Sequence, residues 1–243
     1  MTQASDLKRF YELLDRLAVN NGGPRILGST EGSMGWPTRG VYFVLEKGEH
    51  RSGSGAGSRI VWVGTHGLKA GASSTLWGRL AQPRGSVAGG NHRRSVFRRH
   101  VGRAIAALDP ATSVPSWGRG SSAPPEFAQR ERELESQVSA VIGEMSVLWL
   151  AIDDEPGPES QRGFVERNAI ALLSAYRSGP VDPASLDWLG RRCPSERVKR
   201  SGLWNSNHVD DTIDPDFLDR FEELIEAGVS RPVFSAHFES HPV

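Results

Sequence analysis

The sequence predicts an α/β fold in which a small three-stranded, mixed or antiparallel sheet is flanked by helices. Three short apolar runs, at residues 40–45, 60–63 and 146–152, have the length of buried strands. Between and around them lie segments whose apolar residues recur at spacings of three and four, as in amphipathic helices. The 243 residues, of which 37% are hydrophobic, suffice for one core domain with an N-terminal helix and a C-terminal helical extension.

The first half of the chain contains a helix followed by a pair of strands. A helix is expected over residues 5–19, where Ser5 can cap it and the apolar residues share one face: Leu7, Phe10, Leu14 and Leu17. A glycine- and proline-rich loop then leads to the first strand. The serine- and glycine-rich stretch 47–59 joins the first strand to the second, so the two most simply pair antiparallel.

The rest of the chain alternates helices with the third strand. A short helix, capped by Ser73 or Ser74, is expected to end at Pro83, which cannot continue it. A second helix, at 95–108, has an apolar stripe on one side and arginines on its other faces. Further helices are expected at 126–144, 162–176 and 215–227.

The charged residues are unevenly distributed, although the formal net charge is zero. From His50 to Leu108 the chain has no Asp or Glu, yet it holds ten of the 29 basic residues, nearly all of them arginine. Arginine favours bidentate contacts with phosphate, so this stretch indicates a nucleic-acid partner. The candidate contacts are Arg84, Arg93, Arg94, Arg98, Arg99, His100 and Arg103. The alternatives are a solvated basic face, or an interaction domain whose basic stretch neutralises the acidic remainder of the chain.

Several classes of protein are disfavoured. A single cysteine, Cys193, cannot form an internal disulfide, and no export signal or membrane-spanning run is visible, so a soluble cytoplasmic protein is expected. Neither a glycine-rich phosphate loop nor a structural zinc cluster is present.

Two tripeptides on the paired strands carry a family resemblance. Gly40-Val41-Tyr42 and Trp62-Val63-Gly64 resemble the paired signature of the GIY-YIG nucleases, over roughly residues 38–176. The resemblance implies a metal-dependent endonuclease that hydrolyses phosphodiester bonds in DNA, in restriction, repair or defence. It also implies a division into an N-terminal helix and loop (1–37), a nuclease domain (38–178) and an extension packed on this core (179–243).

The resemblance further implies a set of catalytic residues: Tyr42, Arg79, His92 and Glu166. Tyr42 or His92 would take a proton from the attacking water, with His100 as a second candidate. Arg79, in the helix after the second motif, would stabilise the charge on the pentacoordinate phosphorus. Glu166, in the helix after the third strand, would bind Mg²⁺ or Mn²⁺. Each has an ordinary structural alternative, such as a surface ion pair between Glu166 and Arg162.

Three departures from the family pattern leave a second interpretation open. Trp62 replaces a tyrosine, and Pro83 stands where some relatives have a histidine. The family also uses an asparagine beyond its glutamate, and none stands at a comparable distance after Glu166, since Asn168 is too close and Asn205 is uncertain. The chain could therefore be a catalytically degenerate nucleic-acid-binding module of the same fold. Trp188 and Trp204 either stack on bases or anchor the extension to the core. The oligomeric state stays open, with a homodimer possible.

Overall fold

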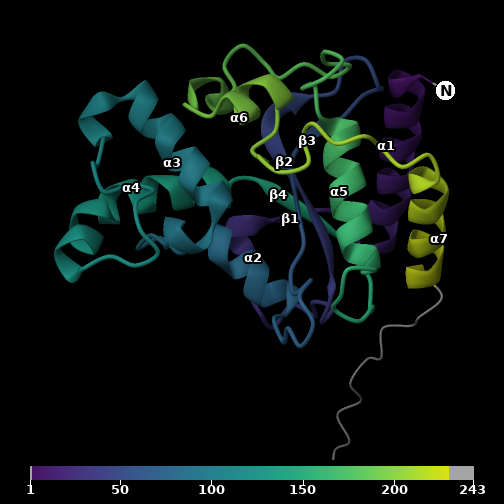
Figure 1. Ribbon diagram of the computed structural model, residues 1–243, viewed down its shortest axis with the longest axis horizontal. Helices are drawn as coiled ribbons and strands as arrows, with labels where there is room; N and C mark the ends of the chain where they lie inside the picture. The colour runs from purple at the N-terminus through teal and green to yellow at the C-terminus, as the bar shows by residue number, and fades with distance from the viewer. Residues whose placement is uncertain (1, 230–243) are drawn as a thin grey trace, which may run out of the picture.

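The computed structural model describes residues 2–229, which form a sheet covered by helices on both faces (Figure 1). The strands are β1 (Arg25–Ile26), β2 (Gly40–His50), β3 (Ser58–Gly64) and β4 (Ser146–Ala151). The α-helices of this region are α1 (Gln3–Asn20), α2 (Leu76–Arg84), α3 (Val96–Leu108), α4 (Pro125–Gly143), α5 (Gln161–Leu173), α6 (Glu196–Ser201) and α7 (Phe217–Val229). None of these helices has both the length and the apolar character needed to cross a bilayer. The expected C-terminal extension is described as far as Val229, and residues 230–243 lie outside this range.

The sheet has four strands, all antiparallel, in the order β1-β4-β2-β3. The prediction of three strands is therefore wrong, although the α/β class and the three longer strands are present. The additional strand, β1, consists of two residues in the glycine- and proline-rich loop, where they pair with the start of β4. A strand this short has no side-chain periodicity, so its partner rather than its own sequence determines it.

Alternation along β2 divides the core into two layers. Val41 and Phe43 face α1, α5 and α7, where Phe10 and Phe221 pack around Phe43. Tyr42 and Val44 point to the opposite face, which is covered by α2, α3, α4 and α6. β3 is the last strand in the sheet order, so one of its edges has no neighbouring strand.

Both tryptophans of the extension anchor it to the core. Trp188 and Trp204 are buried, and each indole N–H donates a hydrogen bond to the Glu46 carboxylate, at 2.9 and 3.1 Å. Burial raises the pKa of Glu46, and these two donors oppose the shift. Buried indoles cannot stack on bases, so the structure supports the anchoring interpretation.

Candidate active site

The two signature tripeptides form one packed unit at the end of β3. Tyr42 in β2 lies opposite Gly64 in β3, and the absence of a side chain at Gly64 leaves room for the tyrosine ring. A Cβ atom at Gly64 would lie 2.5 Å from the Tyr42 hydroxyl oxygen. The Trp62 indole donates a 3.3 Å hydrogen bond to that hydroxyl. Trp62, which replaces the family's tyrosine, thus binds the phenol of the first motif.

Arg79 approaches the same hydroxyl from α2, whose cap is Thr75, one residue beyond the predicted serines. Burial raises the pKa of Tyr42, while the charge and hydrogen bonding of Arg79 lower it; the net direction is upward. Tyr42 is therefore a neutral phenol at neutral pH. The Arg79 guanidinium also donates to the Gln82 side chain and to the Arg94 carbonyl, at 3.1 and 3.4 Å.

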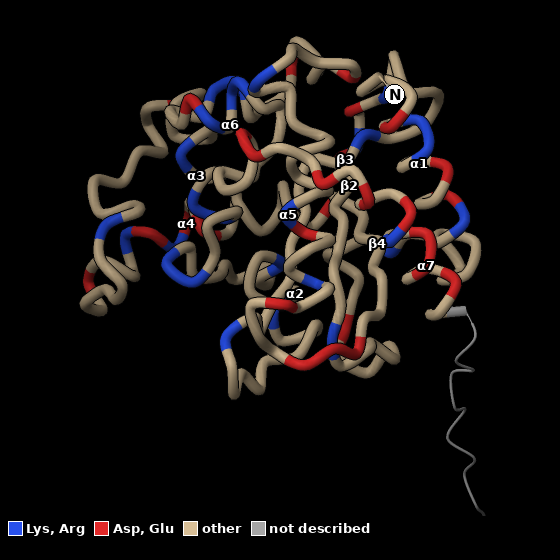
Figure 2. Tube along the Cα trace, turned by 45° about the vertical axis from the view of Figure 1, so that its right-hand side comes forward, with Lys and Arg blue, Asp and Glu red and all other residues tan. Residues whose placement is uncertain are grey.

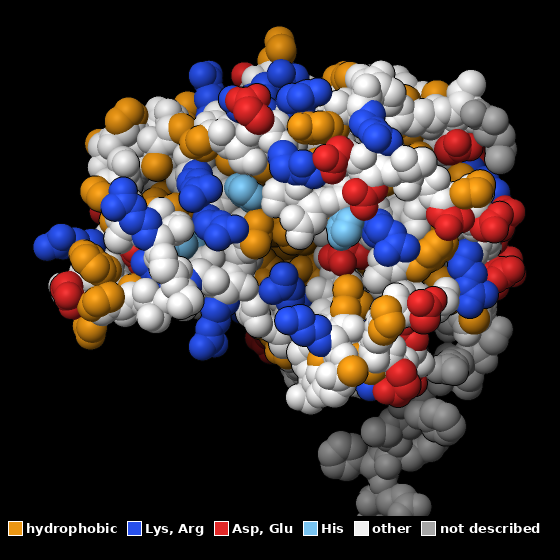
Figure 3. Space-filling model, in the orientation of Figure 1, with side chains coloured by type: hydrophobic (Ala, Val, Ile, Leu, Met, Phe, Trp, Pro, Cys, Tyr) orange, Lys and Arg blue, Asp and Glu red, His pale blue; other side chains and the backbone are white. Residues whose placement is uncertain are grey.

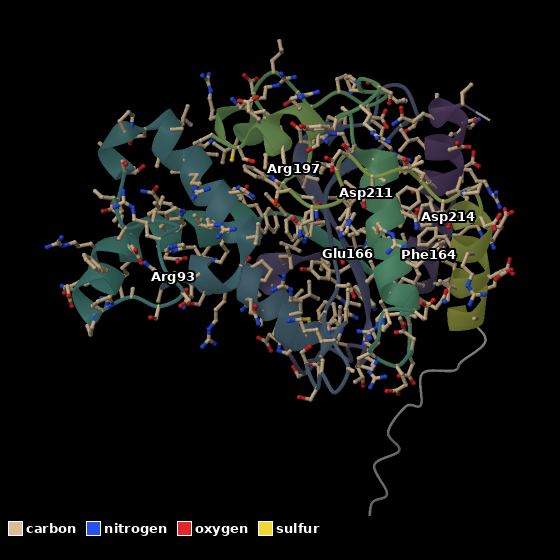
Figure 4. All side chains as sticks on the ribbon, viewed as in Figure 1. Arg93, Phe164, Glu166, Arg197, Asp211 and Asp214 are labelled. Atoms are coloured by element: carbon tan, nitrogen blue, oxygen red, sulfur yellow. The ribbon has the colours of Figure 1, made fainter. Side chains whose placement is uncertain are left out.

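Glu166 reaches the site from α5, on the other side of the sheet (Figure 4). Its Oε1 atom accepts a 3.0 Å hydrogen bond from the backbone N–H of Thr65, the residue that follows β3. The Thr65 hydroxyl donates to the Gly40 carbonyl at 2.8 Å, so Thr65 links the start of β2 to the end of β3. The structure thus brings Tyr42, Arg79 and Glu166 together, as their mutual electrostatic effects show.

The alternative in which Glu166 pairs with Arg162 is wrong. Arg162 is fully buried and points away, toward the Asp154 carboxylate and the His66 carbonyl. Within residues 2–229 Glu166 has no ion pair, and its Oε2 atom has no hydrogen-bond partner. Burial raises the pKa of Glu166, opposed by the Thr65 N–H and by the charges of His208 and Arg79.

A carboxylate oxygen in this state fits a divalent cation. Mg²⁺ binds through one or two carboxylates, completing its coordination with water and substrate phosphates. No cluster of three or more Asp, Glu, His or Cys suited to a metal occurs in the described part of the chain. The Oε2 atom of Glu166 is thus the oxygen available for such an ion. Figure 3 shows this face hollowed between α2 and α5, with basic side chains on the α2 side and acidic and histidine side chains on the α5 side.

His92 does not belong to this site, which corrects its predicted role. Its ring is buried and stacks on Trp117, with centroids 3.8 Å apart. The Nδ1 atom lies 2.9 Å from the Glu135 carboxylate, and Nε2 accepts a 2.9 Å hydrogen bond from the Gly118 backbone. Because both ring nitrogens are engaged, His92 has no free atom with which to take a proton from water.

Two of the arginines predicted as nucleic-acid contacts are internal, so their predicted role is corrected as well. Arg98 is fully buried, and its guanidinium donates hydrogen bonds to the side-chain carboxylate and to the backbone carbonyl of Glu135. The Arg93 side chain is 6% exposed and forms a bidentate pair with Glu131. Arg51 and Arg59 are likewise paired with acids outside the acid-free stretch. Part of the positive charge therefore balances the chain's own acids.

His100 is also an interior residue. Its Nδ1 atom lies 3.7 Å from the Cys193 sulfur, and burial, together with Arg99 and Arg103, lowers the pKa of His100 to about 4. A buried neutral imidazole is unsuited to the phosphate contact predicted for it.

The remaining predicted contacts are arginines that are not fully buried. Within residues 2–229, no ion pair engages Arg84, Arg94, Arg99 or Arg103, although Arg84 donates to the Leu27 and Gly28 carbonyls. Arg94 is exposed and the other three are half-buried. Figure 2 shows basic residues concentrated along α3 and α6, and acidic residues along α7. A cationic surface therefore flanks the site on the α3 side.

The segment that contains Trp204 and Asn205 covers the free edge of β3. The backbone N–H of Trp204 donates to the Val61 carbonyl at 2.8 Å. The Asn205 side chain both accepts from the Val63 N–H, at 3.0 Å, and donates to the Val63 carbonyl, at 2.8 Å. Three residues later comes His208, which is near enough to Glu166 for its charge to lower the pKa of that carboxyl. The sequence contained only a weak signal for this arrangement, a histidine three positions before Asp211.

Comparison with known families agrees with this architecture. A model of the GIY-YIG domain matches residues 1–230, nearly the whole chain. The chain belongs to the GIY-YIG family. This confirms the resemblance seen in the two tripeptides, and membership implies nuclease activity on a nucleic acid. No curated protein and no solved structure matches the chain. The GIY-YIG match includes α1 and the segment that covers β3, so both are parts of the family's domain model.

We expect Gly64→Ala to disrupt the GIY-YIG site, because its methyl group would collide with the Tyr42 hydroxyl. Overpacking of this kind costs about 1–3 kcal/mol, and displacing Tyr42 and Arg79 should lower nuclease activity about 100-fold. Thermal unfolding and DNA cleavage would measure the two effects. Gly157→Ala is the matched control, since a Cβ atom there meets nothing within 4 Å. Full activity of Gly64→Ala at an unchanged melting temperature would contradict this packing.

Proposed function

We propose that this GIY-YIG protein is a metal-dependent endonuclease that hydrolyses phosphodiester bonds in DNA, in restriction, repair or defence. The observation that carries the proposal is the convergence of Tyr42, Arg79 and Glu166 around the end of β3, from both layers of the fold. A buried phenol, a cation and a carboxylate with one free oxygen suit phosphoryl transfer, which depends on positioning and charge stabilisation.

Each side chain has a distinct part in this proposal. Glu166 would hold Mg²⁺ or Mn²⁺, which when bound neutralises charge on the phosphoryl oxygens. Arg79 would stabilise the additional charge that develops around phosphorus, an effect worth about 10²–10³-fold in kcat. Because the pKa of Tyr42 is raised, Tyr42 is better suited to positioning Arg79 as a neutral phenol than to accepting a proton. Tyr42 is itself held by Trp62.

DNA would bind across the surface that includes Arg94, Arg99 and Arg103. These side chains have no ion pairs within the described residues, and arginine suits phosphate recognition. Affinity that depends on several phosphate contacts falls steeply with added salt. A cytoplasmic setting belongs to the same proposal and accords with Cys193, which is buried and unpaired.

Two residues favour the alternative of a degenerate binding module. Trp62 provides an indole where the family has a second phenol, and Pro83 is buried in α2 where some relatives have an imidazole. Neither replacement can accept a proton. Cleavage itself therefore separates the two functions.

We expect supercoiled plasmid DNA to be nicked or linearised in Mg²⁺ or Mn²⁺. Removing the metal with EDTA should abolish cleavage, and adding it back should restore cleavage. The reason is that the divalent cation, which Glu166 would hold, neutralises the charge on the phosphoryl oxygens. A binding module would instead retain DNA with a strong salt dependence and cleave in neither metal. A protein that neither binds nor cleaves single- or double-stranded DNA would contradict both functions.

A further inference from the structure

The site described above lacks a proton acceptor. Hydrolysis of a phosphodiester needs a group that takes the proton of the attacking water. Tyr42 is disfavoured because burial raises its pKa, and His92 is excluded because both its ring nitrogens are bonded. His100 is buried beside Cys193, away from the three converging side chains.

Two other described histidines are equally unsuitable. His50 lies at the opposite end of β2 from Tyr42. His66 follows Thr65, but its Nε2 atom is buried, where water cannot reach it. Burial and the charge of Arg162 lower the pKa of His66 to about 4. Of the five histidines within residues 2–229, only His208 then combines access to solvent with closeness to Glu166.

His208 has the geometry of an oriented base. Its Nδ1 atom lies 2.7 Å from the Asp211 carboxylate, and its Nε2 atom has no partner among the described residues. The side chain is 38% exposed. Figure 4 shows Asp211 and Glu166 on the same side of the molecule, where the chain passes over α5 toward α7. A carboxylate bonded to one ring nitrogen fixes the tautomer and leaves the other nitrogen free to accept a proton.

The backbone around His208 is strained and firmly held. His208 has φ of 62°, the one positive φ of a non-glycine residue within residues 2–229. Side chains other than glycine rarely adopt this conformation, and such residues cluster at functional sites. Asn205 fixes the chain to β3 before His208, and the ion pair of Asp210 with Arg197 fixes it afterwards. This turn therefore holds His208 in the segment that follows the Asn205 contact with β3.

We propose that His208 is a catalytic residue that takes the proton of the attacking water, and that Asp211 is the positioning residue that orients it. This inference rests on the proposed nuclease function. As the water oxygen bonds to phosphorus, one of its protons passes to the Nε2 atom of His208, which has no partner among the described residues. The bond from phosphorus to the leaving oxygen breaks, and that oxygen takes a proton from solvent. The imidazolium, stabilised by Asp211, then returns its proton to solvent, so one water is consumed for each bond cleaved.

The test uses His208→Gly in the full chain, because glycine accepts a positive φ without strain and leaves space for free imidazole. We expect kcat to fall about 10²–10⁴-fold, with KM for DNA little changed. Added imidazole should restore part of the lost rate. Asp211→Asn should lower kcat about tenfold or more, since it weakens the orientation of the ring. His50→Asn, at an exposed histidine outside the site, is the matched control and should cleave like the wild type.

The outcomes separate this inference from the proposed function. A wild-type protein that cleaves in no metal overturns the proposed function, and the role of His208 with it. If the wild type cleaves and Glu166→Gln does not, but His208→Gly stays within about threefold of the wild type, only the inference fails. Loss of activity that imidazole cannot restore, together with a lowered melting temperature in both His208→Gly and His208→Asn, would show a purely structural role. Rescue by imidazole supports the inference, because a structural role gives no reason for it.

Discussion

Replacing Glu166 by glutamine should abolish DNA cleavage while leaving the protein folded. Glutamine is close in shape to glutamate and can still accept the hydrogen bond from Thr65, but it lacks the negative charge that a divalent ion requires. Losing several kcal/mol of transition-state stabilisation corresponds to a fall of about 1,000-fold in kcat. Plasmid cleavage at saturating Mg²⁺ would measure it. Glu133→Gln, at an exposed carboxylate of α4, is the control and should leave the rate unchanged.

The same variant should melt at a higher temperature than the wild type at neutral pH. Burial raises the pKa of Glu166 in the folded protein, so its ionised form is unfavourable there. The folded state is therefore favoured by protonated Glu166. This stabilisation is complete below the pKa of Glu166 in the unfolded chain, and it is lost as the pH rises through the pKa of Glu166 in the folded protein. Glutamine does not ionise, so the difference in melting temperature should shrink as the pH falls below about 4.

Undiminished cleavage by Glu166→Gln would show that the metal ligand has been wrongly chosen.

Removing the Arg98 side chain should destabilise the protein far more than removing an exposed arginine of the same stretch. Arg98 joins three helices, since it binds Glu135 and Ser139 of α4 and the Pro83 carbonyl of α2 from its own position on α3. Arg98→Ala leaves the buried Glu135 carboxylate without its cation, which costs about 3–5 kcal/mol. Chemical denaturation at pH 7 would measure this change.

Arg94→Ala is the matched control for Arg98→Ala. Arg94 is an exposed arginine four residues earlier in the chain, without an ion pair within the described residues. Its removal should change stability by no more than about 0.5 kcal/mol. Equal stability of the two variants would mean that the Arg98–Glu135 pair contributes nothing to the fold.

The sequence predicted the main elements of the fold and the residues that meet at the end of β3. Two short apolar runs and the polar connection between them were enough to predict that β2 pairs with β3, and in the structure Tyr42 lies opposite Gly64. The resemblance to the GIY-YIG nucleases then suggested Arg79 and Glu166, from the helices in which they lie, and the structure brings both near Tyr42. Their catalytic roles stay predictions. Local periodicity was informative because each of these elements is long enough to show its buried face.

Ion pairs between distant segments explain the incorrect predictions. A run of residues without acids suggested that its arginines face a polyanion. The partners of Arg93 and Arg98 are instead Glu131 and Glu135, which stand more than 30 residues later and four positions apart on one face of α4. Nothing in the local sequence of α3 indicates that pairing. His208 was missed for a similar reason, because a side-chain amide rather than a helix or strand determines where it lies.

The amide of Asn205 also limits how two copies of this protein can associate. By occupying the N–H and carbonyl of Val63, it leaves the outer side of the sheet without free backbone groups at that position. The opposite margin, β1, is only two residues long. A continuous sheet spanning two subunits is therefore disfavoured at both margins. If the protein cuts both strands of a duplex as a pair, helical surfaces must set the separation and stagger of the two cuts.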